Sequence, residues 1–475
     1  MTKLGARPSN ADYGCVASLL LGPLLRRVTD GQATLWLQTD QPATVTVAAG
    51  GVSTTTSTFT VEGVHLALPV LSGLASGPTA YTVHIDGVPV WPLPDHPPSV
   101  ITIPPDDEVT IAFGSCRERK RHPDPDALEA YANRAMRGEA PLPDLLALIG
   151  EQIYADEVWT FAEYARLYLD TWSVPPVRWL LSTVPTMMIF DDHEIHDDWN
   201  SSAAWLTDMR RHPAWEEHLR AGLMSYWVFQ HMGNLPPVAD PEHLPDDWSY
   251  TVDIGRTRLI MLDCRGSRQL DERRMFPQEH WDRLAERSQV DCDHLVLACS
   301  LPWLLAPAVH HTEALMEVLS HRFGGAMEWL RRKYDLEHWA AVGHSFDELA
   351  ALIQTVDRPA TVSVIGGDVH HSYLARPSGR PGVHQITCSP LNHSADPVMR
   401  VALRLGWWRP LAWLAEKAAR LAGVPAPKLT WHRLTKPYFG NAIATLTHRG
   451  RSASVLLEGV RRDGTLRPVA RHDLT

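Results

Sequence analysis

The chain has 475 residues, a formal net charge of −11 and a pI near 6.1. This length predicts two domains and a large core, whereas the acidic balance excludes a general nucleic-acid binder, so no specific nucleic-acid partner is expected. Six cysteines without a CxxC pair are typical of a reducing compartment. Residues 1–15 lack the pattern of a signal peptide, and the apolar stretch 17–25 is too short to cross a bilayer, so we expect a cytoplasmic protein.

Residues 22–98 alternate apolar and polar side chains in short runs separated by turn residues. The expected strands cover residues 33–39, 44–49, 57–61, 65–71 and 80–86. This spacing predicts a small antiparallel β-sandwich of the fibronectin-III-like kind at 1–98, with a packing and positioning role. Residues 91–105 carry six prolines, which exclude a helix or a central strand. We therefore assign 99–106 as a Pro-rich linker to a second domain at 107–475.

Two β-branched runs early in the second domain lead through glycine into residues that can bind metals. Residues 109–116 (VTIAFGSC) end at Cys116, and residues 144–156 (DLLALIGEQIYAD) supply Glu151 and Tyr154. Short apolar runs of this kind predict buried strands. Both strands are therefore expected to present their polar residues at their carboxyl ends.

Residues 184–200 (VPTMMIFDDHEIHDDWN) pass abruptly from an apolar run into a dense group of charges. The run predicts a buried strand, because Pro185 is tolerated at its first residue. The charged group after it comprises Asp191, Asp192, His193, Glu194, His196, Asp197 and Asp198. These carboxylates repel one another unless a cation lies among them, which favours a metal site. A solvated acidic loop is the alternative that this segment alone leaves open.

Residues 361–371 (TVSVIGGDVHH) repeat the pattern of strand, glycine and ligand-capable side chains. In extended backbone Asp368 and His370 lie on one side and His371 points away. Ligands bind at the carboxyl ends of strands in open α/β sheets, so we expect the side chains of these four strand ends to converge. A mixture of oxygen, imidazole and one thiolate suits iron or manganese with a second hard cation better than a structural zinc.

The segments between these strands predict layers of helices on the sheets. Helices are expected at 126–138, 156–172, 199–231 and 277–288, and further strands at 259–264 and 294–301. The aromatic stripe of the second helix is expected to pack on a sheet, and the Trp-rich segment 199–231 to roof one side of the site. Asp263 and Arg265 follow a strand, where they either place a cation near a phosphate or form a surface ion pair.

Residues 396–433 reverse the acidic trend of the chain. Basic side chains recur among tryptophans and aliphatic residues, at Arg400, Arg404, Arg409, Lys417, Arg420, Lys428 and Arg433. Two interpretations remain open: a pair of helices packed over the active domain and split at Pro410, or an amphipathic surface that contacts a membrane peripherally. Beyond it, residues 441–457 predict a hairpin that completes a sheet of the second domain.

Four motifs together resemble the alkaline phosphatase D (PhoD-like) branch of the calcineurin-like metallophosphoesterases. They are FGSC at 113–116, GEQIYAD at 150–156, DDHE at 191–194 and GGDVHHS at 366–372. The resemblance spans residues 107–390 and includes SLPWLLAP at 300–307 and TCSPLNH at 387–393. It implies an N-terminal all-β sandwich and an α/β four-layer (α-β-β-α) metallophosphoesterase domain with helical insertions.

The resemblance also implies a set of metal ligands. Cys116, Tyr154 and Glu151 would hold a redox-type metal, with Glu151 as the bridge to a second ion. Asp192 and Asp368 would hold the second ion, His370 would reach one of the two, and Asp197 is a further candidate. The implied cofactors are two or more metal ions, namely iron or manganese plus calcium or another divalent cation.

The implied activity is the hydrolysis of phosphomonoesters or phosphodiesters by a metal-activated water. His193, supported by Glu194, would protonate the leaving oxygen or contact the phosphate, and Arg117 would grip a phosphate oxygen. The expected substrate is a small phosphate ester or a lipid headgroup, and the sequence does not indicate an oligomeric state.

One residue departs from the family pattern. Glu151 stands where the family has aspartate, and the extra methylene extends the carboxylate by roughly 1.5 Å. Either the backbone compensates and activity survives, or the protein is a catalytically weak binder of phosphorylated ligands. The survival of the other ligand residues favours the enzyme.

Overall fold

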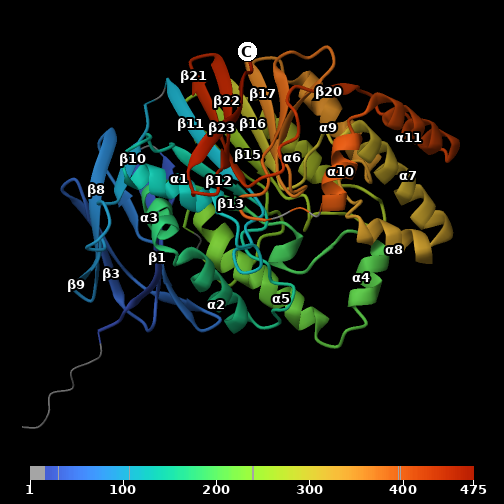
Figure 1. The fold of residues 1–475 in the computed structure, drawn as a ribbon. Helices are drawn as coiled ribbons and strands as arrows, with labels where there is room; N and C mark the ends of the chain where they lie inside the picture. The colour runs from blue at the N-terminus through green and yellow to red at the C-terminus, as the bar shows by residue number, and fades with distance from the viewer. Residues whose placement is uncertain (1–15, 30, 106, 238–239, 394, 396) are drawn as a thin grey trace, which may run out of the picture.

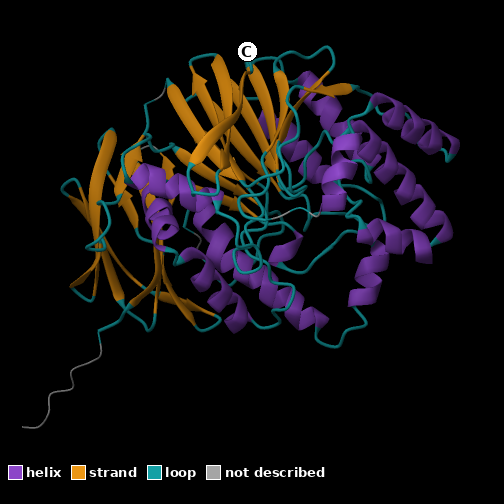
Figure 2. Ribbon diagram, viewed as in Figure 1, coloured by secondary structure: helices purple, strands orange, loops and turns teal. Residues whose placement is uncertain are grey.

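The computed structural model describes residues 16–29, 31–105, 107–237, 240–393, 395 and 397–475 (Figure 1). The predictions for residues 1–15, with Cys15, and those for residues 106 and 396 lie outside the described residues. An all-β unit lies at one side of the molecule, and mixed α/β sheets with their helices form the remainder (Figure 2). This arrangement agrees with the predicted division into an N-terminal β region and an α/β region.

The N-terminal unit consists of two five-stranded sheets that enclose one apolar core. The first contains β1 (Leu19–Thr29), β2 (Gln32–Thr39), β5 (Phe59–Val61), β6 (Val64–Ala67) and β7 (Val70–Ser72); the second contains β3 (Thr44–Ala49), β4 (Val52–Ser57), β8 (Gly77–Ile85), β9 (Val88–Trp91) and β10 (Val100–Ile103). β10 falls inside the predicted linker and corrects it. The four residues of β10 lie between prolines, and they pair with β8 at the edge of the sheet, where flanking prolines are tolerated.

Two mixed sheets form the centre of the α/β region. The six-stranded sheet runs β13 (Thr186–Ile189), β12 (Leu145–Ile149), β11 (Glu108–Gly114), β21 (Ala442–Arg449), β22 (Ser452–Val460) and β23 (Leu466–Asp473). The seven-stranded sheet runs β14 (Tyr250–Ile254), β15 (Thr257–Leu262), β16 (His294–Cys299), β17 (Thr361–Gly366), β19 (Val383–Thr387), β18 (Tyr373–Pro377) and β20 (Trp431–Arg433). The β21–β22 hairpin joins β11, as predicted for residues 441–457.

Side chains alternate between two cores along the strands of the seven-stranded sheet. Leu259 and Met261 belong to the core shared with the six-stranded sheet, whereas Ile260 and Leu262 belong to a second core with helices α6 (Gln278–Ser288) and α9 (Gly343–Thr355). The helical segments are α1 (Ala127–Met136), α2 (Phe161–Trp172), α3 (Pro175–Thr183), η1 (Asp192–Glu194), α4 (Ala203–Met209), α5 (Trp215–Tyr226), η2 (Trp227–His231), η3 (Met232–Asn234), α6 (Gln278–Ser288), α7 (Pro307–Phe323), α8 (Gly325–Lys333), α9 (Gly343–Thr355), α10 (Pro397–Leu405) and α11 (Arg409–Leu421).

The Trp-rich segment is helical as predicted, but it does not roof the site. Trp205, Trp215 and Trp227 are buried in the main core, and the segment passes through a π-helical turn, η2. The aromatic stripe of α2 packs on this segment, where the ring of Tyr168 stacks on that of Phe229 at 4.6 Å. The segment is therefore part of the core and lies against β13, the strand that leads into the site. Its large apolar side chains favour burial over exposure.

The sandwich is attached to this segment through buried polar contacts. The Arg26 guanidinium of β1 donates to the carbonyl oxygen of Gln230 at 2.6 Å and to the side-chain oxygen of Asn234 at 2.7 Å. The Trp36 indole donates to the carbonyl oxygen of Val228 at 2.9 Å. Both side chains are fully buried, so the two units share a fixed interface.

Helices α7, α8, α10 and α11 form a helical block at the side of the molecule opposite the sandwich (Figure 1). α11 packs along α7, as the packing interpretation of residues 396–433 predicts. The break between α10 and α11 lies where Pro410 was expected to split the segment, and Pro410 occupies the first turn of α11. The outer side chains of α10 and α11 remain exposed.

Candidate metal centre

Four strand ends, three from the six-stranded sheet and one from the seven-stranded sheet, bring the predicted ligands to one place. Cys116 follows β11, Glu151 follows β12, Asp191 and Asp192 follow β13, and Asp368 follows β17. Glycines permit the close approach of these strand ends. A Cβ on Gly367 would lie 2.2 Å from the hydroxyl oxygen of Ser115. A Cβ on Gly150 would lie 2.9 Å from the Cβ atoms of Asp191 and Ser300, and φ at Gly150 is +102°.

Four candidate ligands adopt left-handed backbone conformations. The φ angles are 58° at Cys116, 55° at Glu151, 61° at Asp368 and 49° at His370. The expectation that Asp368 and His370 share a side through extended backbone is therefore wrong. Their side chains are directed to the site by a tight turn instead, and His371 is turned away so that its ring stacks on that of Tyr373. Such conformations are sparsely populated, and proteins concentrate them at functional sites.

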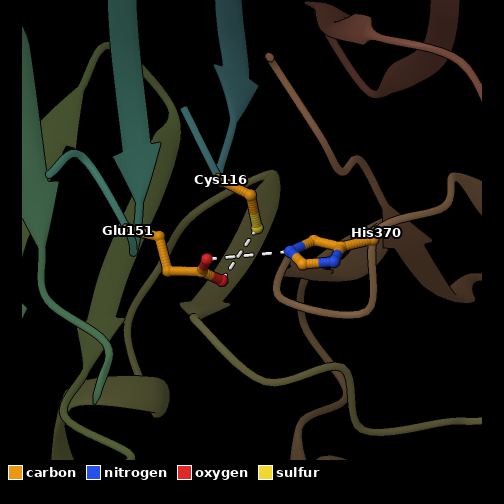
Figure 3. A group of neighbouring side chains, drawn as sticks. All are labelled: Cys116, Glu151 and His370. Carbon is orange, nitrogen blue, oxygen red and sulfur yellow. Dashed lines mark hydrogen bonds and ion pairs between the residues drawn. The ribbon is translucent and has the colours of Figure 1, made fainter. Parts of the chain in front are cut away.

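Cys116, Glu151 and His370 form a compact group of potential ligands (Figure 3). The Cys116 Sγ lies 2.9 Å from Glu151 Oε1, and the His370 Nε2 lies 3.7 Å from Glu151 Oε2. The Tyr154 hydroxyl donates to the same Glu151 carboxylate. One carboxylate thus contacts a thiol, a phenol and an imidazole that come from three different segments.

The electrostatics of this group favour a bound cation. Burial, reinforced by the charge of Glu151, raises the pKa of the Cys116 thiol well above its ordinary value. Burial and Glu151 likewise raise the pKa of Tyr154. Both groups are therefore protonated by themselves, whereas a metal ion would stabilise their anions and deprotonate them. Thiolate, phenolate, carboxylate and imidazole are a donor set that fits iron or manganese.

A second group is formed by Glu151, Asp191 and Asp368, whose carboxylate oxygens lie within 4.8 Å of one another. Glu151 belongs to both groups, which is the arrangement expected of a bridge. The sequence prediction did not include Asp191, although the motif DDHE contains it. Its inclusion depends on which of two adjacent aspartates turns inward, and Asp191 is fully buried.

Arg265 places a buried cation among these carboxylates. Its guanidinium forms ion pairs with Asp191, with Asp192 at 3.3 Å and with Glu337 at 2.5 Å. The interpretation of Arg265 as part of a surface ion pair is therefore wrong, because its side chain is 1 % exposed. One cation does not offset the cluster: burial raises the pKa of Asp192 to about 7 despite Arg265, and burial also raises the pKa of Asp191 well above its ordinary value.

Asp192, His193 and Asp197 form a third group on the same loop. The His193 Nδ1 lies 2.9 Å from Asp156 Oδ1, and its Nε2 lies 3.9 Å from Asp197 Oδ1. Burial by itself lowers the pKa of His193, but Asp192 and Asp156 outweigh it and raise that pKa well above its ordinary value. His193 is therefore a protonated donor.

Glu194 has a different position from the one predicted. Its carboxylate accepts backbone N–H groups from Glu151 at 3.0 Å, Gln152 at 2.7 Å and Asp191 at 2.8 Å. It also accepts the side-chain amide of Gln230 at 3.2 Å. Asp156, not Glu194, supports His193. Glu194 instead joins the loops that follow β12 and β13.

Arg117 is also displaced from its predicted role. Its guanidinium donates to Asp126 at 2.7 Å and to the carbonyl oxygen of Thr171 at 3.1 Å, and its side chain is 3 % exposed. Asp126 caps the N-terminus of α1. Arg117 therefore connects α1 and α2. It is not available to grip a phosphate, because its charge is already paired with Asp126.

Two further groups surround the centre without a clear sequence signal. The His338 imidazole bridges Asp368 Oδ2 at 2.6 Å and Glu313 Oε1 at 2.8 Å. His393 stacks on His370 with ring centroids 3.9 Å apart, and its Nε2 lies 3.8 Å from the Glu118 carboxylate. The family-like motif TCSPLNH contains His393, and this was the one available hint.

A cavity of about 720 Å³ opens onto these groups. The predicted residues that line it are Glu151, Asp192, His193, Asp197, Asp368 and His370. Cys116 and Tyr154 lie behind Glu151 and contact its carboxylate. The structure thus gathers eight of the ten predicted site residues around one cavity and separates Arg117 and Glu194 from it.

Comparison with known proteins places this geometry in context. The family model of PhoD-like phosphatases matches residues 129–396, which is more than half of the chain, and a domain of unknown function (DUF7800) matches residues 16–103. A solved structure of PhoD is similar with a TM-score of 0.62 and 13 % identity, covering 96 % of this chain and 91 % of that chain. At that identity the likeness establishes the fold alone.

GAP50, the anchor in the inner membrane complex of Plasmodium, matches with a TM-score of 0.40 and 10 % identity, over 78 % of this chain and 89 % of that one. Among curated protein sequences none matches this chain significantly. In the part of the chain that the structure describes, every helix is too short or too polar to cross a membrane.

The bonds of Glu194 predict a supporting role that can be separated from catalysis. In Glu194→Gln, one amide nitrogen would face backbone N–H groups that now donate to an oxygen. We expect metal affinity to fall about 10- to 100-fold and stability to fall by about 1 to 3 kcal/mol. Equilibrium dialysis with metal analysis and denaturant unfolding measure the two effects.

Glu163→Gln is the matched control for Glu194→Gln. Glu163 also accepts two backbone N–H groups, from Trp159 at 3.1 Å and Thr160 at 2.9 Å, but it is an exposed helix-capping residue. Its substitution should leave metal affinity unchanged. Equal metal affinities in wild type and Glu194→Gln would contradict the supporting role.

The environment of Cys116 predicts thiol reactivity that depends on metal. With metal bound, a thiol reagent should modify Cys116 slowly, because the ligand is shielded. After chelation, modification should remain slow near neutral pH and accelerate as the pH rises above 9, because the raised pKa delays formation of the thiolate. Mass spectrometry of peptides follows the reaction. Cys299, buried away from the cluster, should not respond to the chelator; a response shared by both would indicate unfolding.

Proposed function

The chain belongs to the PhoD-like phosphatase family, and we propose that it hydrolyses phosphomonoesters or phosphodiesters with metal ions held at the carboxyl ends of β11, β12, β13 and β17. The observation that carries this proposal is the position of Glu151. Its carboxylate belongs to both the Cys116–His370 group and the Asp191–Asp368 group. A shared carboxylate between two ligand groups is what a two-metal phosphoesterase requires.

The proposed ligand sets follow from these groups. Cys116, Tyr154, Glu151 and His370 would hold iron or manganese, and Glu151, Asp192 and Asp368 would hold calcium or another divalent cation. Asp191 joins the second set on its geometry, and Asp197 is a further candidate at the open side of the cavity. When bound, two such ions lower the pKa of a water molecule and offset charge that develops on the phosphoryl group.

The protein supplies the remaining chemistry through His193. Its Nδ1 is fixed by Asp156, so its Nε2 faces the cavity. The pairing of Nδ1 with Asp156 favours the protonated ring, and Nε2 can donate its proton to the oxygen of the leaving alcohol. Asp156 then stabilises the proton that remains on Nδ1. Arg265 holds Asp191 and Asp192 in place, because its guanidinium contacts both.

Finer features of the proposal extend beyond the site. The two facing sheets with helices on their outer sides support a four-layer arrangement of the metallophosphoesterase type. Substrates would be small phosphate esters or lipid headgroups, and the protein would act in the cytoplasm. The exposed Trp408, which precedes α11, and Trp413 of α11 support a peripheral contact of residues 397–433 with a membrane surface.

The roles assigned to His193 and Asp368 predict that two substitutions have different effects. His193→Ala should lower turnover of an aryl phosphate about 10²- to 10⁴-fold while keeping its metal, because a general acid is lost. Asp368→Ala should lose metal and turnover together. Metal analysis of each purified variant beside its kcat/KM provides the measurement.

His196→Ala serves as the control for both substitutions. His196 lies on the same loop, and its ring packs edge-on against Trp205 at 6.0 Å. This variant should keep both metal and turnover. Comparable metal loss in His193→Ala and Asp368→Ala would remove His193 from the acid role and make it a ligand.

The alternative function is a catalytically weak protein that binds phosphorylated ligands, because Glu151 replaces the aspartate of the family. The contacts of Glu151 favour the enzyme: its positive φ turns the longer side chain so that both oxygens have partners, Cys116 and Tyr154. This geometry supports a backbone that is adjusted to glutamate. A lesion would leave a carboxylate oxygen without such partners.

Shortening Glu151 distinguishes these alternatives. In Glu151→Asp, the carboxylate should fall short of one ligand group, so we expect turnover and occupancy of the second metal to fall about tenfold or more. Assays of wild type, Glu151→Asp and Glu151→Ala with aryl monoester and diester substrates provide the comparison. A tenfold gain in Glu151→Asp, equivalent to about 1.4 kcal/mol in the barrier, would identify the native protein as a weakened enzyme.

A further inference from the structure

The cavity at the candidate metal centre has two chemically different walls. One wall carries the carboxylates and imidazoles described above. A second wall, contributed by α7, α10 and α11, is mainly aliphatic, with Val309, Met399, Ala402, Leu403, Leu405 and Leu411. This second wall cannot bind a phosphoryl group, because aliphatic side chains donate no hydrogen bonds to its oxygens.

We propose that this aliphatic wall is a subsite for an alkyl or acyl chain, so that the substrate is an amphiphilic phosphate ester drawn from an anionic lipid surface. The proposal rests on the proposed function, which it narrows to a substrate class. The reaction is unchanged: the bond from phosphorus to the alcohol oxygen is replaced by a bond to the oxygen of water, and the alcohol leaves with a proton.

The size and shape of the cavity support a substrate larger than a simple phosphate. Its volume of about 720 Å³ is within the range of pockets that enclose whole small-molecule ligands. The wall is also held in place, because α11 packs along α7 and Gly406, which follows α10, contacts the first turn of α7. The Ala308 amide donates to the carbonyl oxygen of Gly406 at 3.0 Å, and a Cβ on Gly406 would lie 2.9 Å from a methyl group of Val309.

The surface around the cavity supports a lipid source. Tyr334 and Leu405 both line the cavity and are 47 % exposed, so the aliphatic wall continues onto the outside of the molecule. The exposed large hydrophobic residues of the described α/β region all lie on this helical block: Phe323, Trp329, Tyr334, Val398, Val401, Leu405, Trp408, Trp413, Leu414 and Leu421. Singly scattered exposed residues are ordinary, but their concentration on one helical block, with Tyr334 and Leu405 at the cavity, marks an interaction surface.

Charge complementarity selects an anionic membrane as the occupant of this surface. The chain is acidic overall, yet α10 and α11 carry Arg400, Arg404, Arg409, Lys417 and Arg420 against Glu416 alone. Lys417 lies over the ring of Trp413 at 5.9 Å, which pairs a cation with an aromatic ring at the surface. Tryptophan beside lysine and arginine is the composition of helices that lie in an anionic lipid interface.

A homologous series of substrates tests the subsite. Ethyl, butyl, hexyl and octyl p-nitrophenyl phosphates, below their aggregation concentrations, should show kcat/KM rising about three- to fourfold per added methylene until the wall is filled. In the double variant Leu405→Gln and Leu411→Gln, the octyl-to-ethyl ratio of kcat/KM should fall at least tenfold. Val88→Gln, an exposed apolar residue of the sandwich, is the control and should keep the wild-type ratio.

The outcomes separate this proposal from the proposed function. If the kcat/KM of the wild type does not rise with chain length, the subsite is overturned while hydrolysis stands. The same follows if the double variant keeps the wild-type octyl-to-ethyl ratio of kcat/KM. If no ester is hydrolysed, the proposed function fails, and calorimetry with ethyl- and octylphosphonate still decides the subsite. Tighter binding of octylphosphonate that the double variant loses supports it, and equal binding of both overturns it.

Vesicle binding tests the lipid source. The full-length protein should co-sediment with vesicles of phosphatidylglycerol and much less with vesicles of phosphatidylcholine, and Trp413→Ser with Lys417→Gln should weaken this at least fivefold. Val88→Gln is again the control. Equal sedimentation with both lipids, or a dimer in velocity sedimentation that the same double substitution dissociates, overturns the anionic surface and assigns the face to another occupant.

Discussion

The repulsion among buried carboxylates is the constraint on which the centre depends. Glu151, Asp191, Asp192, Asp368 and Glu337 all lie within reach of Arg265 or of one another. Arg265, His193 and His338 offset part of this charge. The remainder must be offset by protons or by metal ions, since burial penalises every uncompensated anion. The raised pKa of Asp192, about 7, expresses that demand. A bound cation would therefore stabilise the ionised form of these carboxylates.

Holding these anions together requires a rigid frame, and one buried carboxylate provides much of it. Glu194 binds the backbone of the loops after β12 and β13 at once, and Gln230 connects it to the π-helical turn. The carbonyl oxygen of Gln230 in turn accepts from Arg26 of the sandwich. A continuous path of hydrogen bonds thus leads from the N-terminal unit to the ligand loops. Through this path the sandwich holds the helical turns η2 and η3 in place next to the ligand loops.

The sequence predicted those features that depend on local pattern. Strand runs followed by glycine located Cys116, Glu151 and Asp368, and the apolar run before DDHE located Asp192, because ligands bind at the carboxyl ends of strands in α/β sheets. Contacts between residues that are distant in the sequence could not be predicted from local pattern. Arg265, Asp156 and His338 reach the centre from separate segments. The roles of Arg117 and Glu194 were misassigned because adjacency in sequence does not fix the direction of a side chain, either after the left-handed Cys116 or within the short helix η1. The strand β10 was not predicted because its four residues lie between prolines.

The aliphatic wall and the charged wall of the cavity depend on each other. α7 and α10 place aliphatic side chains in the same cavity as the carboxylates, and low polarity strengthens the interactions of His193, Arg265 and any bound cation with them. The same low polarity makes that wall favourable for an alkyl chain, which loses its hydration when it packs there. An amphiphilic ester would cover the wall with its apolar part while its phosphate meets the charged side. Occupation of one wall would thus dehydrate the other, and a chain that fills the subsite should raise turnover as well as affinity.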